Sequence, residues 1–127
     1  MNPEQLKFTG THEWIEPAGI RRKVGITDFA QKELGDIVYV EFPEEGKKVA
    51  AGEDACLIES AKATSSVMTP LPGKLAAFNL SLVNAPEKIN QSPYEEGWLF
   101  ELEPEPGADE SALFDYQAYR KLQEEED

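Results

Sequence analysis

The chain has 127 residues, 40% of them hydrophobic, and 25 acidic against 12 basic residues give it a formal net charge of −13. This length supports one modest hydrophobic core, so we expect a single domain over residues 1–127. The negative charge argues against nucleic acid, whose phosphates would be repelled, and against an anionic membrane surface. Protein partners with basic patches suit this charge, although solubility alone explains much of it.

The sequence also bears on the compartment. The N-terminal residues show no signal or transit peptide pattern, and no apolar run approaches the length of a membrane span. The single cysteine, Cys56, cannot form an internal disulfide, which suits a reducing compartment. We therefore expect a cytoplasmic protein. Cys56 lies in an apolar strand flank, and the only histidine, His12, has no evident link to it, so we predict a buried thiol rather than a nucleophile.

Most of the chain is predicted to form short strands joined by turns that contain proline or glycine. The apolar and β-branched residues that indicate strands lie at residues 8–16, 20–26, 36–42, 54–58, 65–69, 73–79 and 98–102. Many short strands with little helix indicate a mostly β fold. We predict a flattened β-barrel or β-sandwich, with a β core over about residues 8–102 and short helices at its edges.

Two short helical segments are predicted between these strands. Thr27 or Asp28 is expected to cap the first, which ends before Gly35. Asp28 and Gln31 resemble a capping box. Asn84 is expected to cap the second, with a proline tolerated in its first turn.

A C-terminal helical region is predicted over about residues 108–123, after a proline- and glycine-rich segment. Its apolar side chains can form one stripe that packs on the sheet, and they are Leu113, Phe114, Tyr116, Tyr119 and Leu122. The acidic residues 123–127 are expected to fray, because carboxylates oppose the negative end of the helix dipole.

The central feature of the sequence is a lysine between two strand-like flanks. Residues 54–58 and 65–69 are the flanks, and Lys62 lies where they meet, so we predict a β-hairpin with this lysine at its tip. One turn with proline and glycine precedes the hairpin and another follows it, each at a similar distance from the lysine in the sequence. This layout resembles lipoyl and biotinyl carrier domains, which display a modified lysine on a hairpin tip. Biotinyl domains usually place methionine on both sides of it, whereas Ala61 and Ala63 favour a lipoyl domain.

Several blocks of sequence together resemble the glycine cleavage system H protein family. They follow the family's order and spacing from about residue 8 to residue 102. The blocks are Thr11-His12-Glu13-Trp14, residues 24–37, Glu59-Ser60-Ala61-Lys62-Ala63 and residues 90–98. The resemblance implies a lipoyl-domain-like fold, a barrel-sandwich hybrid.

The resemblance further implies a carrier and not an enzyme. Lipoate would be attached covalently to Lys62 through an amide. The arm would accept the aminomethyl group of glycine at a pyridoxal-phosphate enzyme, glycine decarboxylase, and carry it to a tetrahydrofolate-dependent aminomethyltransferase. An FAD-containing dihydrolipoyl dehydrogenase would then reoxidise the dithiol. A tethered cofactor meets each partner at high local concentration, while the protein supplies presentation and docking.

The same resemblance assigns the residues around the lysine. Glu59 and Ser60 would help lipoyl-attaching enzymes to recognise the hairpin, and Ala61 and Ala63 would flank Lys62 in the cofactor-binding segment.

Glu13 is a further candidate. In the family, an acidic residue of the His-Glu-Trp segment lines the cleft that shelters the loaded arm, whose cargo is easily lost to water. The alternative is that Glu13 is a solvated strand residue. His12 is predicted to lie on the strand surface, and Trp14 and Trp98 are predicted to be packing anchors.

The sequence departs from the family pattern in three places. Ala61 replaces the usual valine, and residues 66–68 differ from the usual acidic-aliphatic-aromatic run. Glu33 stands where some members place a histidine that helps to line the cleft, so that contact cannot be carried over. These departures leave Lys62 unaffected, but they leave open which enzyme system this chain serves.

Other functions remain open at this point. An H-like lipoyl carrier could serve another pathway, such as lipoyl relay or a redox or sulfur-handling system. A hydrolytic or redox enzyme has little support, because the sequence has no Ser-His-Asp pattern, phosphate-binding glycine loop or metal-ligand spacing. An interaction module with an unmodified Lys62 is the last alternative, and it predicts that Lys62→Arg is silent.

Overall fold

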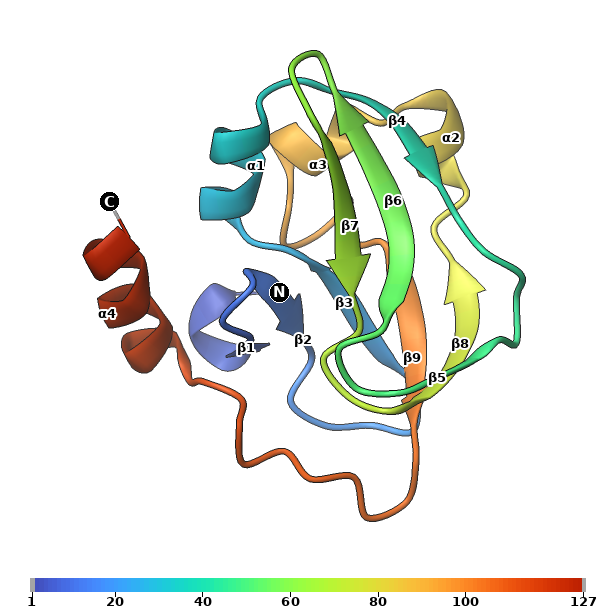
Figure 1. Ribbon diagram of the computed structural model, residues 1–127, viewed down its shortest axis with the longest axis vertical. Helices are drawn as coiled ribbons and strands as arrows, with labels where there is room; N and C mark the ends of the chain where they lie inside the picture. The colour runs from blue at the N-terminus through green and yellow to red at the C-terminus, as the bar shows by residue number, and fades with distance from the viewer. Residues whose placement is uncertain (1, 127) are drawn as a thin grey trace.

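Two antiparallel sheets form the framework of the protein in the computed structural model, which describes residues 2–126 (Figure 1). The larger sheet consists, in spatial order, of β1 (Lys7–Phe8), β2 (Glu13–Ile15), β3 (Arg22–Ile26), β9 (Phe100–Pro104), β8 (Gly73–Phe78) and β5 (Lys48–Val49). The smaller sheet consists of β4 (Ile37–Glu41), β6 (Asp54–Ser60) and β7 (Thr64–Met68). The predicted mostly β sandwich is therefore confirmed.

The core lies between these sheets, because side chains from both contribute to one apolar cluster. Val24 and Phe100 from the larger sheet and Ile58 from the smaller one are all 0% exposed. Burying a side chain of this size contributes about 1.5–3 kcal/mol relative to leaving it in water. The apolar side chains that both sheets contribute to this cluster thus hold the sheets face to face.

The helices are short and lie around the sheets. They are the 3-10 helix η1 (Pro3–Gln5) and the α-helices α1 (Asp28–Leu34), α2 (Ser81–Asn84), α3 (Lys88–Gln91) and α4 (Tyr116–Glu126). Among the residues that the structure describes, no helix is both long enough and apolar enough to cross a membrane.

A second apolar cluster joins the C-terminal helix to the first strands. It contains Leu6, Phe8, Trp14 and Tyr119. The rings of Phe8 and Tyr119 are stacked with their centroids 4.7 Å apart. Phe114 precedes α4 and pairs with Phe8 through two backbone hydrogen bonds of 2.8 Å. The helix is therefore fixed against β1 as well as packed on it.

The prediction of one strand over residues 8–16 is wrong, because β1 and β2 are separate strands joined by a turn. His12 has a φ of 72°, a left-handed conformation that no strand contains. Its amide donates to the carbonyl of Thr9 at 3.2 Å, and the Thr9 amide donates to the carbonyl of Glu13 at 3.0 Å. The turn reverses the chain, so β1 and β2 pair with each other.

The predicted ends of the first helix, Thr27 and Gly35, are confirmed, but the capping box and the Asn84 cap need correction. Thr27 caps α1 by accepting from the Ala30 amide at 3.2 Å, whereas Gln31 donates to Asp28 Oδ1 at 2.9 Å, so there is no capping box. Asn84 ends α2 instead of capping a helix, and α3 begins only at Lys88.

The C-terminal helix differs from its prediction at both ends. It begins at Tyr116 rather than near residue 108, because Phe114 pairs with β1 in extended form. The expected fraying is wrong for residues 123–126, which are helical. An ion pair of 2.6 Å between Glu126 and His12 Nε2 holds this end. Asp127 lies outside the described residues.

Candidate functional site

The predicted hairpin is confirmed, with Lys62 at its tip. Strands β6 and β7 pair up to Glu59 opposite Thr64, which leaves residues 60–63 to reverse the chain. The Ser60 hydroxyl accepts from the Lys62 amide at 3.2 Å and from the Ala63 amide at 3.0 Å. The serine side chain thereby supplies hydrogen-bond acceptors for two amides of a turn that lacks the usual Asn-Gly sequence.

The tip is also attached to the segment between α1 and β4. The Ala61 amide donates to the Asp36 carbonyl at 3.0 Å, and Ser60 pairs with Ile37 across the sheet. The Lys62 side chain lies across Gly35: a Cβ built on that glycine would be 2.8 Å from Lys62 Cε. The lysine is exposed and therefore accessible to another protein.

A cavity of about 180 Å³ lies between α1, β7 and the turn before β2. Its apolar wall consists of Ile26, Phe29, Ala30, Leu34 and Val67, and its polar lining consists of Thr11, His12, Glu13, Glu33, Ser65 and Ser66. Leu34 immediately precedes Gly35, and Ser65 is the second residue of β7, which begins directly after the hairpin tip. The cavity thus begins beside the segments that position Lys62.

Glu13 is buried at this cavity, with 3% of its surface exposed, so the alternative of a solvated strand residue is wrong. The hydroxyls of Thr9 and Thr11 both donate to Glu13 Oε1 at 2.5 Å, and the Met68 amide donates to Oε2 at 3.5 Å. Burial raises the pKa of the Glu13 carboxyl, although these hydrogen bonds and the nearby His12 oppose the rise. The carboxyl group at this cavity therefore has a pKa above its ordinary value.

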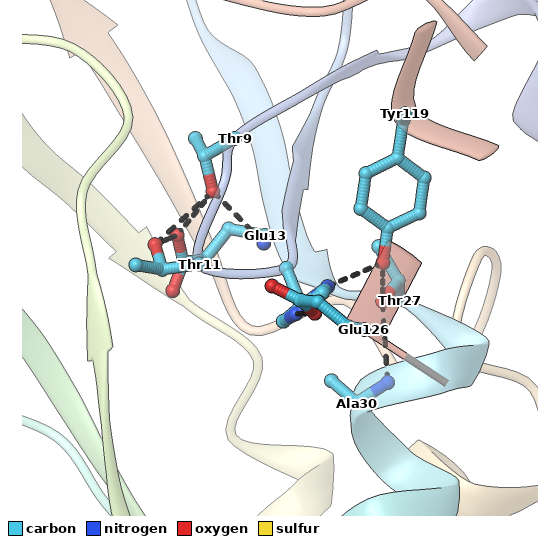
Figure 2. A network of polar contacts seen from close by, with 8 residues as sticks. Thr9, Thr11, Glu13, Thr27, Ala30, Tyr119 and Glu126 are labelled. Carbon is cyan, nitrogen blue, oxygen red and sulfur yellow. Dashed lines mark hydrogen bonds and ion pairs between the residues drawn. The ribbon is translucent and has the colours of Figure 1, made fainter. Parts of the chain in front are cut away.

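His12 is not on a strand surface as predicted but connects the turn to α4. Its Nδ1 lies 2.8 Å from the Tyr119 hydroxyl, and its Nε2 is 2.6 Å from Glu126. The Tyr119 hydroxyl also lies 2.7 Å from the hydroxyl of Thr27, the residue that caps α1 (Figure 2). This network links the Glu13 turn, helix α1 and the C-terminal helix.

A larger hollow, about 480 Å³, lies between α1 and α4. Tyr94, Tyr119, Lys32 and Arg120 are among its lining residues. No residue of the β6–β7 hairpin lines it, so we assign the site to the smaller cavity beside the lysine.

The other predicted residues take ordinary positions. Glu59 is half-buried on β6, where it pairs with Tyr39 and Thr64. Cys56 is buried and burial raises the pKa of its thiol, so the prediction of an inert cysteine is confirmed. Trp14 is 1% exposed and anchors the second cluster, as predicted.

Sequence reasoning missed several parts of this site. Glu33 lines the cavity although no contact could be assigned to it beforehand. Gly35 contacts the lysine, and Tyr119 orients the His12 turn. The pair of threonines around Gly10 was the available signal, because a Thr-Gly-Thr sequence before a carboxylate favours a turn over a strand.

Comparison with known proteins fits this geometry. The model of the family described as Glycine cleavage H-protein matches residues 6–126. The chain belongs to this family. A glycine cleavage system H protein of Anaeromyxobacter sp. (strain K) is 47% identical over 125 residues, covering 98% of each chain. One from Thermus thermophilus is 44% identical over 124 residues, covering 98% of this chain and 97% of the relative.

A solved structure supports the glycine cleavage H-protein assignment in three dimensions. The crystal structure of a glycine cleavage system H protein from Mycobacterium marinum superposes with a TM-score of 0.87 at 34% identity, covering 96% of this chain and 98% of the other. The chain therefore has the lipoyl-domain-like barrel-sandwich fold. The described residues contain no group of His, Cys, Asp and Glu that could hold a metal ion.

Proposed function

We propose that this chain is the lipoyl-bearing shuttle of the glycine cleavage system. It carries the aminomethyl group of glycine from the pyridoxal-phosphate decarboxylase to the tetrahydrofolate-dependent aminomethyltransferase, and then presents the dithiol to dihydrolipoyl dehydrogenase. It is a carrier, and the enzymes it visits perform the reactions. The observation that supports this most directly is Lys62 on a hairpin tip beside a cavity, in a chain of the H-protein family.

The residues of this chain fit lipoate attached to Lys62. The lysine is exposed, which an attaching enzyme requires, and the turn around it is fixed by Ser60. The cavity next to it has both apolar and polar lining residues, which suits an aliphatic arm with a polar terminus. When bound, lipoate supplies a dithiol and disulfide pair that can accept the aminomethyl group and be reoxidised.

Glu13 supplies a carboxyl group to the polar lining of the cavity in this proposal. Its carboxyl is held by Thr9 and Thr11 and so has a fixed position. An ionised carboxyl can accept hydrogen bonds from an amine, and a protonated one can donate. Burial raises the pKa of this carboxyl and so favours its protonated form relative to an exposed glutamate. Residues of α1 and β7 line the cavity and limit the access of water to it.

The test is an intact mass and a peptide map of the protein purified from its own cells. We expect the mass of a lipoyl group on the peptide that contains Lys62. Lys62→Arg should abolish both the modification and the release of carbon dioxide from glycine with the purified decarboxylase, because arginine keeps the charge but cannot form the amide. Lys48→Arg, an exposed lysine of β5 outside the hairpin, is the matched control and should leave both unchanged.

The results separate the remaining functions. An unmodified Lys62 in cells that make lipoate contradicts the proposal and leaves an interaction module. A lipoylated protein that supports no glycine cleavage with the partner enzymes indicates a carrier for another pathway.

A further inference from the structure

Gly35 occupies a position that glycine alone fits, for two separate reasons. It ends α1 with φ 81° and ψ −160°, a backbone conformation found essentially only in glycine. Its α-carbon also faces the Lys62 side chain: an added Cβ would be 2.8 Å from Cε and 3.8 Å from Cδ and Cγ. The aliphatic stem of the lysine therefore lies along the glycine over several carbons.

Other turn glycines of this chain lack the second feature. Gly46 and Gly52 have φ values of 87° and 78°, and nothing lies within 4 Å of a Cβ built on either. Their conformation explains them fully. At Gly35 the missing side chain additionally leaves room for Lys62, so this glycine relates directly to the candidate site.

The contact places the lysine stem one residue from Leu34, which lines the cavity. Gly35 follows Leu34, and α1 contributes both Leu34 and Phe29 to the cavity wall. At a rise of 1.5 Å per residue, the helix carries the wall about 9 Å from Gly35 to Phe29. β7 contributes the opposite wall and begins directly after the hairpin tip. A chain that continues from Lys62 along α1 therefore enters the cavity and approaches Glu13.

We propose that Gly35 is a positioning residue for the carrier arm. It lets the aliphatic stem of Lys62 pack against the C-terminal end of α1 and so directs the modified side chain into the cavity instead of into solvent. This inference rests on the proposed lipoylation of Lys62. An alanine at this position pushes the stem away from α1 and raises the exposure of the arm.

The first experiment tests the contact alone, in the unlipoylated wild-type protein. Nuclear Overhauser effects between the Gly35 α-protons and the Lys62 δ- and ε-protons are expected. Their absence overturns the proposal whether or not Lys62 is lipoylated in cells. This measurement needs no variant, so it decides the question even if Gly35→Ala fails to fold.

The second experiment measures the exposure of the arm in the lipoylated protein. A water-soluble phosphine reduces the dithiolane, and we expect the rate to rise several-fold in Gly35→Ala relative to wild type. Gly52→Ala is the matched control, because it places alanine at a positive φ with nothing within 4 Å of the added Cβ, and its rate should equal that of wild type. Equal rates in all three proteins overturn the proposal.

The failure of this inference differs from the failure of the proposed function. If Lys62 is lipoylated but wild type and Gly35→Ala are reduced at equal rates, Gly35 does not position the arm, and the carrier function is unaffected. A Lys62 that is not lipoylated in cells removes the carrier function, while the Overhauser contact still reports on Gly35.

Discussion

Removal of the Tyr119 hydroxyl tests whether the C-terminal helix holds the turn that carries Glu13. Tyr119 is 1% exposed, and its hydroxyl lies 2.7 Å from Thr27 Oγ1 and 2.8 Å from His12 Nδ1. In Tyr119→Phe the ring still stacks on Phe8, so the apolar contact is kept. The variant therefore isolates the hydrogen bonds from the packing.

The expected loss in the free energy of unfolding follows from the burial of Thr27 and His12, the two partners of the hydroxyl. Thr27 is 0% exposed, so its hydroxyl loses a partner that water cannot replace, at a cost of about 1–3 kcal/mol. His12 is only partly buried, so water can take the vacated place and the loss there is about 0.5–1 kcal/mol. We expect a total of about 1.5–4 kcal/mol. With a urea m-value of about 2 kcal/mol/M, the urea midpoint of unfolding falls by about 0.75–2 M.

The assay is urea unfolding followed by tryptophan fluorescence and circular dichroism. The matched control is Tyr116→Phe on the same helix: its ring also packs against Phe8, but its hydroxyl takes no part in the network of Thr27, His12 and Tyr119. The control should change the free energy of unfolding by less than about 0.5 kcal/mol. If Tyr119→Phe costs no more than the control, the network does not hold α4 to the turn.

Two further variants test the cavity and the packing. Glu13→Gln should become more stable relative to wild type as pH rises from about 4.5 through the raised pKa, because the unfolded wild-type chain releases the Glu13 proton first. Free energies of unfolding measured from below pH 4.5 to neutral pH check this, and a constant difference contradicts the raised pKa. Gly25→Ala places a Cβ 2.7 Å from the buried Trp14 ring and should cost about 1–3 kcal/mol in urea unfolding. A change below about 0.5 kcal/mol would show that the ring can move aside.

The strands, the first helix and the hairpin could be predicted because their signals are local. β-branched and apolar residues mark β4 and β6, and Thr27 and Gly35 mark the ends of α1 within one short stretch. The turn at residues 60–63 likewise depends on Ser60, which hydrogen-bonds to its own neighbours. Such features need only the residues beside them.

The strand pattern of residues 8–16 concealed their division into two strands, although Thr-Gly-Thr is a local turn signal. These residues have strand propensity, but the φ of His12 and the bonds from Thr9 and Thr11 to Glu13 favour a turn. The extent of α4 also depends on distant residues, because His12 holds its end at Glu126 and Phe8 keeps Phe114 extended. Long-range contacts therefore override local propensity at both ends of α4, whereas short-range hydrogen bonds form the turn before β2.

The sequence by itself determined that Lys62 stands at a hairpin tip, because the two strand-forming flanks and the serine turn are contiguous in the chain. Only the tertiary structure decided what surrounds that lysine. The cavity brings together residues 11–13, 26–34 and 65–67, and Gly35 meets Lys62 although β4, β5 and β6 lie between them in the chain. The burial of Glu13 and the contact between Gly35 and Lys62 arise only when the sheets pack. The raised pKa of Glu13 and the position of the lysine stem are therefore properties of the folded chain.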